Sequence, residues 1–485
     1  MLARNLIAAA GNAGGGVSYW IDEWVPSNTN NYITRVAVNS NRSSILFVAM
    51  NDAGSGGYPY YIELDYDGNP IRKSYFSPTT GLSNSYLLDV FPYGSDYVVV
   101  HQNTYSGAYL WTLGLVDETS STNLREAYNQ TYNNTAPTPS ATPTYQDGSY
   151  QPGTQRIYAN DSYIAKFDGG GDSFYYAPDY QTVVGAAKMT YSGVGLTSGS
   201  TNGFITNSGW YEPYDDTRRA QISSPYGSNY HLIRWWLYSY NSNFYSTWNA
   251  STGAVSTPKR VSGANFNSGI KLCINPTNGY LYDITNSNGV TCVIYYQTTG
   301  NVNTYYYPDT LRNISWNTVT ASTTGVIIDA AIDSDGNMYL LWGRGYIMKI
   351  SSSFTVVWAA SITDSTASYV SPANLEYINS IRIEDVDGTE VMFVTLRLNA
   401  KSGQTTKNIQ IHKLPLDLDN YYGTYGNVTY AAVNSSYVTI GSATAVTTYT
   451  SPMYSATGPS NNLTGNLAGP TNMTEQTWTV NQQSI

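Results

Sequence analysis

The chain has 485 residues, which is ample for a large core, and only 12% of them are charged, about half the usual share. Hydrophobic residues make up 41% and aromatic residues 14%, including 47 tyrosines, which excludes a disordered chain. The net charge is −10 without a basic patch, which argues against a nucleic-acid partner, and no apolar run approaches the roughly 20 residues of a membrane span.

The N-terminal segment 1–16 is expected to be a short anchor rather than a signal peptide. Its apolar stretch is interrupted by Arg4 and Asn5, which makes it too weak for a secretory signal. Gly14, Gly15 and Gly16 then form a flexible joint that leads into the first strand.

After this segment the sequence repeats a unit of apolar strand, polar turn and second apolar strand. The clearest copy has expected strands at 327–332, 338–342, 346–350 and 355–358, joined by three tight turns. Four short strands connected in this way are typical of one blade of a β-propeller. Looser copies begin at Ile33, Tyr86, Ile270 and Ile378.

The spacing of the copies indicates the number of blades. Neighbouring clear copies begin 51 to 57 residues apart, close to the ~40–50 residues of known blades. In the first copy, further strands are expected at 60–64 and 71–76, joined by an Asp67-Gly68-Asn69 hairpin turn. Between 140 and 265 the pattern is less regular, and 155–167, 186–197 and 230–238 could each open a blade. The sequence predicts an all-β propeller of six to eight blades over 17–435, and we favour seven.

Two segments compete to complete the last blade. Its expected strands at 378–383, 390–398 and 408–414 leave an outermost place open. Residues 17–24 begin like the last strand of the clearest blade and are one candidate, and residues 428–433 are the other. Either segment would remove an exposed sheet edge.

Residues 436–485 are expected to form a C-terminal extension. One strand pair, 437–440 with 445–449, precedes a stretch rich in Ser, Asn, Gly, Pro and Thr and nearly without charge. Such a segment rarely packs alone, so we expect it, where ordered, to lie on a neighbouring subunit.

The acidic turns of the repeats resemble the start of a calcium loop. They are 333–337 and 385–390, but position twelve holds Arg344 or Leu396 in place of the required Glu. We therefore predict hairpin turns capped by Asp and Gly, and we expect neither metal nor cofactor.

Histidines and cysteines give no cluster for catalysis. His101, His231 and His412 lie in expected strands of different blades, where isolated strand residues are favoured over a catalytic or metal site. Cys273 and Cys292 lie on expected neighbouring strands, so a bridge is possible, but two buried thiols are favoured.

Acidic and aromatic residues leave two functional alternatives. Paired carboxylates could cleave glycosides, and the candidates are Asp22, Glu23, Asp89, Asp161, Glu212, Asp215, Asp216 and Glu376. A chain with this many acidic residues contains pairs at any required spacing by chance, so no catalytic residue is assigned. The aromatic runs are the better hint, because exposed Tyr and Trp stack on sugars, although packing between blades is favoured for any one pair. These runs are 58–61, 174–176, 235–236, 295–296 and 305–307.

Taken together, these features resemble tail-associated β-propeller virion proteins of bacteriophages. The resemblance rests on the leader 6–12, Gly14–Gly16, the strand 17–20 and the blade turn 335–339, and it covers most of 1–435. It implies a multi-copy structural or host-recognition component of a phage tail or fibre, extracellular when assembled and without a cofactor. Its implied partners are other tail proteins, further copies of the chain and host-surface glycans. A polysaccharide-degrading tail enzyme and a bacterial surface adhesin are the alternatives.

Overall fold

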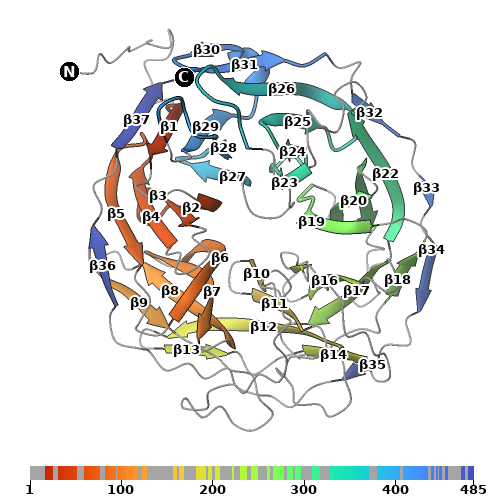
Figure 1. Ribbon diagram of the computed structural model, residues 1–485. Coiled ribbons are helices and arrows are strands. Elements are labelled where there is room, and N and C mark those ends of the chain that lie inside the picture. The colour runs from red at the N-terminus through yellow and green to blue at the C-terminus, as the bar shows by residue number, and fades with distance from the viewer. Residues whose placement is uncertain are drawn as a thin grey trace.

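The computed structural model is built almost entirely of β-strands, which form sheets arranged around a ring (Figure 1). The described residues are 17–25, 31–51, 59–76, 82–93, 95–105, 108–116, 123–127, 157–160, 163–168, 182–192, 195–198, 203–207, 221–222, 230–237, 242–249, 259–262, 266–277, 281–287, 290–296, 308–316, 327–370, 380–404, 408–434, 438–441, 444–445, 447–450, 454–456, 471–475 and 479–484. Side chains are described mainly within 17–24, 35–48, 61–72, 327–370, 380–404 and 408–434. The fold is all-β and propeller-like.

Successive strands pair antiparallel with their neighbours along the chain and form meanders. The first comprises β2 (Asn31–Asn39), β3 (Ser44–Asn51), β4 (Pro59–Asp65) and β5 (Pro70–Phe76). The next comprises β6 (Leu82–Tyr93), β7 (Asp96–Tyr105), β8 (Ala108–Val116) and β9 (Asn123–Ala127). Then come β10 (Ile157–Asn160), β11 (Tyr163–Asp168), β12 (Thr182–Ser192) and β14 (Gly203–Asn207), with β13 (Gly195–Ser198) paired to β12.

The meanders continue in the same way around the ring. One comprises β15 (Gln221–Ile222), β16 (Tyr230–Leu237), β17 (Ser242–Asn249) and β18 (Lys259–Ser262). It is followed by β19 (Phe266–Ile274), β20 (Leu281–Ser287), β21 (Val290–Tyr296) and β22 (Pro308–Trp316). Next come β23 (Ile327–Ile332), β24 (Met338–Trp342), β25 (Tyr346–Ile350) and β26 (Val356–Asp364). The last comprises β27 (Ser380–Val386), β28 (Thr389–Arg397) and β29 (Ile409–Pro415).

These bounds correct two of the three expectations in the irregular region. Residues 186–197 open no sheet, because they fall in β12, the third strand of its meander, and in the paired β13. Residues 155–167 overlap β10 and β11, whereas 230–238 overlap β16, the second strand of its meander. An inner strand of a sheet that is covered on both faces carries the same apolar run as a first strand, so composition alone does not separate them.

The N-terminal strand β1 (Trp20–Val25) pairs with β29, in a register that aligns Trp20 with Lys413 and Trp24 with Ile409. Residues 20–25 thus extend this sheet beyond β29, but they are not its outermost strand, because residues 479–484 pair with the other edge of β1. The rival segment lies elsewhere: β31 (Val428–Ala432) pairs with β26 and with β30 (Gly423–Tyr425). A 3₁₀ helix, η1 (Leu418–Tyr421), connects β29 to β30.

The remaining strands return along the outside of the ring in the order opposite to the meanders (Figure 1). We call β31 to β37 the belt. Strands β32 (Val438–Ile440) and β33 (Thr444–Ala445) pair with β22, β34 (Thr447–Thr450) with β18, and β35 (Tyr454–Ala456) with β14. β36 (Thr471–Glu475) pairs with β5 and β9, and β37 (Thr479–Ser484) pairs with β1.

The belt contradicts two expectations about the C-terminal extension. Its strands lie on sheets of their own chain rather than on a neighbouring subunit, and 437–440 does not pair with 445–449. The physical reason is that a polar strand without a core of its own is stabilised by backbone hydrogen bonds to an open sheet edge.

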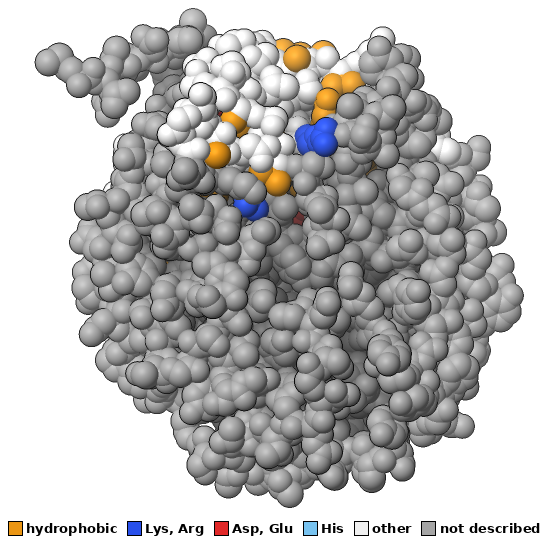
Figure 2. Space-filling view, viewed as in Figure 1, with side chains coloured by type: hydrophobic (Ala, Val, Ile, Leu, Met, Phe, Trp, Pro, Cys, Tyr) orange, Lys and Arg blue, Asp and Glu red, His pale blue; other side chains and the backbone are white. Residues whose placement is uncertain are grey.

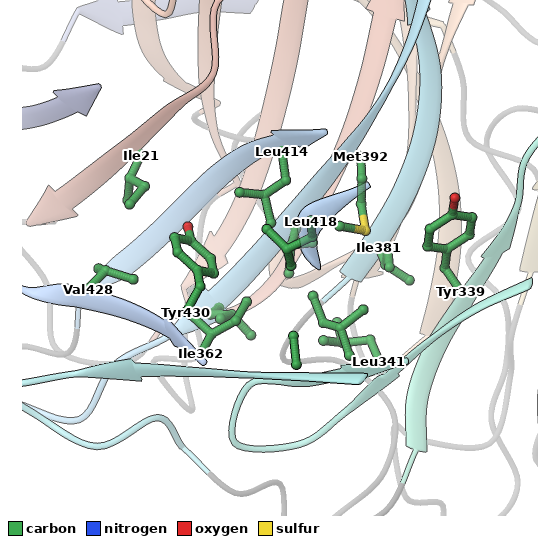
Figure 3. Close-up of a cluster of buried hydrophobic side chains, with 14 of the residues drawn as sticks. Ile21, Tyr339, Leu341, Ile362, Ile381, Met392, Leu414, Leu418, Val428 and Tyr430 are labelled. Atoms are coloured by element: carbon green, nitrogen blue, oxygen red, sulfur yellow. The ribbon is translucent and has the colours of Figure 1, made fainter. Parts of the chain in front are cut away.

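Two hydrophobic cores enclose the sheet of β27–β29 and β1. One face packs against the sheet of β23–β26, with Leu414 and Met392 opposite Tyr430 and Ile362 (Figure 3). The other face packs against β2–β5, with Ile409 and Ile411 in the same core as Phe47 and Trp24. Burial on both faces explains the apolar run 391–394 within β28. No helix in the described part of the chain has the length and hydrophobicity to cross a membrane.

Candidate functional site

The acidic turns 65–69 and 333–337 share an Asp-x-Asp-Gly-Asn sequence and one geometry. Asp333 Oδ1 accepts a hydrogen bond from the Asn337 backbone N–H at 2.7 Å, and its Oδ2 accepts from Asn337 Nδ2 at 2.8 Å. Asp65 makes the same two contacts with Asn69, also at 2.7 and 2.8 Å. The Asp carboxylates therefore hold the turns closed, as predicted from the hairpin pattern. Among the described residues, no group of three or more acids, histidines or cysteines could hold a metal ion.

The turn 333–337 also connects neighbouring sheets. Asn275, which follows β19, donates from Nδ2 to the Gly336 carbonyl at 3.2 Å. On the other side Glu390, on β28, accepts from the Ser334 N–H at 3.0 Å and from the Ser334 hydroxyl at 2.7 Å. One turn thus contacts the sheets on both sides of its own.

A buried ion cluster occupies the contact between β2–β5 and β6–β9. The fully buried Glu63 lies 2.6 Å from Arg42 Nε and 2.6 Å from Arg72 Nε, and it accepts a hydrogen bond from the Ser44 hydroxyl at 2.6 Å. Tyr97, from β7, donates to the Ser44 carbonyl at 2.7 Å, and burial raises its pKa. The cluster therefore ties two meanders together.

Glu23, one of the candidate acids, lies in a second buried network. It accepts hydrogen bonds from Asn408 Nδ2 at 2.7 Å and Gln410 Nε2 at 3.1 Å, and Lys401 Nζ lies 2.6 Å from its Oε1. Gln410 Nε2 also donates to Asp364 Oδ2 at 2.7 Å, and Tyr369 donates to Gln410 Oε1 at 2.7 Å.

Glu23 and Asp364 are thus two carboxylates held by one amide group. Asp364 Oδ1 in turn accepts hydrogen bonds from the backbone N–H groups of Thr366 and Ala367, at 2.7 and 3.3 Å. Both acids are engaged in holding β1 and β29 to the end of β26. Asp22, the neighbouring candidate, is fully buried on the opposite face of β1.

His412 is a buried residue at the contact of two sheets. It lies on β29, and its Nδ1 is 2.6 Å from the hydroxyl of Tyr430 on β31. Burial lowers its pKa to about 3, so the imidazole is neutral. On the opposite face of β29, Lys413 donates to the Tyr66 carbonyl at 2.7 Å, and burial lowers its pKa to about 8. Sequence reasoning missed Lys413, because its partner is 347 positions away.

The cysteines do not lie on neighbouring strands, which corrects the expectation from the sequence. Cys273 is on β19 opposite Tyr282, and Cys292 is on β21 opposite Thr285, so β20 separates the two. Cys273 forms no disulfide and is half-buried rather than buried.

Several other candidates lie outside the described parts of the chain. Asp161, Glu212, Asp215, Asp216, Glu376 and the runs 174–176 and 305–307 are outside the described residues. Asp89 lies on β6, His101 on β7, and His231 with the run 235–236 on β16, but their side chains are not described. Nor are those of the run 295–296 on β21. In the run 58–61, Tyr61 is fully buried, as the packing explanation predicts.

A group of half-buried tyrosines lies where η1 meets the N-terminal strand. The rings of Tyr19 and Tyr421 meet edge to face at 5.5 Å, and Tyr425 donates to the Tyr421 carbonyl at 3.0 Å. We call Tyr19, Tyr421 and Tyr425 the tyrosine rim. Burial raises the pKa of Tyr19 and of Tyr425, so these two phenols are neutral at pH 7. In the view of Figure 2 the described surface is mostly backbone and uncharged polar side chains, with scattered hydrophobic ones.

No protein-family model and no curated protein sequence matches the chain. Solved structures resemble it weakly. The Dos1 propeller is 8% identical over 81% of this chain and 94% of its own, with a TM-score of 0.37. Hydrazine synthase from Kuenenia stuttgartiensis is 9% identical over 79% of this chain and 97% of its own, with a TM-score of 0.41. Prolyl oligopeptidase B from Galerina marginata is 12% identical over 73% of this chain and 45% of its own, with a TM-score of 0.30. Likeness at this level carries no argument about function.

Proposed function

We propose that the chain is a structural virion component of a phage tail or fibre that contributes to attachment to host-surface glycans. In this proposal each meander is one blade, which gives a propeller of seven blades with β1 completing the last one. Residues 1–16 anchor the chain, 17–435 form the propeller, and 436–485 form the extension on its outer edge. The protein acts in many copies with other tail proteins and needs neither catalysis nor a cofactor.

The use of buried charge supports a scaffold. Glu63 and Glu23 each interact with three donor side chains. In both cases these donors lie on different strands or connecting segments, so each acid links several parts of the fold. A catalytic carboxylate must reach a substrate proton within hydrogen-bond distance. The carboxylate oxygens of Glu63 and Glu23 are instead bound by side chains that connect neighbouring strands.

The tyrosine rim is the observation that carries the attachment role. Its rings are half-buried, Tyr421 and Tyr425 pack against the hydrophobic core, and tyrosines give large contact area at low cost in conformational entropy. Exposed aromatic faces stack on sugar rings, and Asp417 and Asp419 beside the rim can accept hydrogen bonds from sugar hydroxyls. The rim lies at the start of the described N-terminal strand, so it borders the proposed anchor.

The location of the protein tests the first half of the proposal. Antibodies raised against the recombinant chain are expected to label the tails of virus particles released by its host, as seen by negative-stain electron microscopy. Label on the cell envelope and not on particles would contradict the virion role and support the adhesin alternative.

Binding tests the second half. The Tyr421→Ala variant is expected to bind host envelope polysaccharide at least about tenfold more weakly than the unchanged chain, because one good aromatic contact contributes about 1.5 kcal/mol. Val357→Ala is the control, since Val357 is 51% exposed and is not one of the rim residues. Equal binding of both variants would contradict the rim, and release of reducing sugar would support the enzyme alternative.

A further inference from the structure

His412 lies between two sheets that belong to different parts of the chain. It belongs to β29, where its backbone pairs with Ile21 of β1 and Val394 of β28. Its side chain reaches Tyr430 of β31, which is the first strand of the belt and pairs with Ile362 of β26. Its side chain is fully buried, and that of Tyr430 is 1% exposed. The contact therefore joins the ring to the start of the belt.

The surroundings of the imidazole stabilise its neutral form and not its protonated form. Nδ1 shares one hydrogen bond with the Tyr430 hydroxyl, and Nε2 is buried without a hydrogen-bond partner among the described residues. A second proton would put a charge into an apolar core that contains Ile21, Val428 and Leu414 (Figure 3). When the proton of the neutral form is on Nδ1 and is donated to the Tyr430 hydroxyl, the second proton also creates an N–H at Nε2 without an acceptor, which costs free energy unless water enters.

The charged and titratable groups packed around His412 do not offer that acceptor. From β31 and β30 they are Tyr430 and Tyr425, whose rings lie 5.8 Å apart, and burial raises the pKa of both. From the end of β26 and the segment after it they are Asp364 and Tyr369, both bonded to Gln410. From β1 it is Glu23, which is paired with Lys401. β28 contributes the apolar Val394 beside the ring.

We propose that His412 is an acid-sensitive contact, which holds the first strand of the belt to the ring at neutral pH and loosens it when the imidazole is protonated. Opening lets water solvate the cation at Nε2. The strand β31 then loses its side-chain contact with β29, and its pairing with β26 over five residues opens and uncovers the outer edge of β26. This inference does not depend on the virion role.

Hydrogen exchange of the full chain tests the proposal. The sign follows from a pKa of about 3 in the closed state against 6.5 in the open one, since only the open state takes up the proton between these values. Exchange of the amides of β31, corrected for the intrinsic effect of pH, is expected to rise about 25-fold from pH 7 to pH 5. In His412→Gln this rise is expected to disappear. Asp335→Asn, which changes one charge at an exposed turn and leaves the imidazole and its buried surroundings in place, is the control and keeps the rise.

A rise that persists in His412→Gln, or that disappears in Asp335→Asn, would overturn the proposal. The unchanged protein offers a second test that requires no variant to fold. With ¹³C-labelled histidine, one of the three imidazole signals is expected to remain neutral down to at least pH 5 while the fold persists. Ordinary titration of all three signals near pH 6.5 would contradict the buried neutral imidazole.

Discussion

At the scale of single residues, charge is buried where neighbouring sheets meet. Glu63 and its two arginines lie between β2–β5 and β7, and Glu23 lies between β1, β29 and the end of β26. Desolvating such groups is costly, and the cost is offset only when every charge keeps its partners. Removing one member is therefore much more damaging than the net strength of the cluster suggests.

Glu63→Gln is expected to lower the free energy of unfolding by about 3–5 kcal/mol, because it leaves Arg42 and Arg72 buried around a neutral amide. Urea denaturation followed by tryptophan fluorescence measures the change. Asp335→Asn removes one negative charge at an exposed turn position and is expected to change stability by less than about 0.5 kcal/mol. Equal losses in both variants would show that net charge, and not the buried cluster, sets the effect.

Alanine substitutions at Gly336 and Gly388 can separate the cost of backbone strain from the cost of steric overlap. Both have φ of +80°, which costs an alanine about 1 kcal/mol. A Cβ at Gly336 would lie 2.6 Å from Asn275 Nδ2 and 2.7 Å from Thr277 Oγ1, whereas one at Gly388 meets nothing within 4 Å.

Gly388→Ala is therefore expected to cost about 1 kcal/mol, and Gly336→Ala about 2–4 kcal/mol, since the latter also displaces the Asn275 contact between sheets. Thermal unfolding of the two variants compares these costs directly. Equal losses would mean that Asn275 moves aside without consequence.

At the scale of elements, β1 is held by aromatic packing as well as by pairing. Trp24 is fully buried and meets Phe47 of β3 edge to face at 5.7 Å. Trp24→Ala is expected to lower the free energy of unfolding by about 3–5 kcal/mol through the cavity it leaves. Ile71→Ala, at a side chain 54% exposed, is the control and is expected to cost less than about 1 kcal/mol. A Trp24→Ala loss as small as the control's would mean that pairing with β29 holds β1 without its tryptophan.

The elements that the sequence predicted well are those marked by local chemistry. The Asp-x-Asp-Gly-Asn turn 333–337 and the strands that follow one another around it, from β23 to β26, are determined by hairpin geometry that a few adjacent residues encode. The order of strands in the region 182–198 did not follow, because an inner strand has no local mark of its place in the sheet.

The inter-sheet contacts of the candidate site could not be predicted from the sequence. Glu23 and Gln410 are 387 positions apart, and His412 and Tyr430 are in strands of different sheets. Such pairs depend on the register and on which meanders become neighbours, and no short motif encodes either. The belt was missed for a related reason, since edge pairing uses the backbone and leaves little side-chain pattern.

At the scale of the whole molecule, the belt covers sheet edges that would otherwise be open. The last strand, β37, pairs with β1 over six residues, so the N-terminal and C-terminal strands lie side by side in one sheet with β29. Open edges offer unpaired N–H and C=O groups to other chains. By pairing with these edges, the belt is expected both to stabilise the ring and to prevent its sheets from pairing with other copies of the chain.

Removal of residues 479–485 is expected to uncover the edge of β1 and to promote association between copies. Size-exclusion chromatography with light scattering should show a larger share of dimers and higher species than in the full chain, rising with protein concentration. Val480→Pro with Gln482→Pro keeps the chain length but prevents β37 from pairing, and is expected to act in the same way. An unchanged mass distribution in both variants would mean that β1 is protected without β37, and that the belt contributes to stability alone.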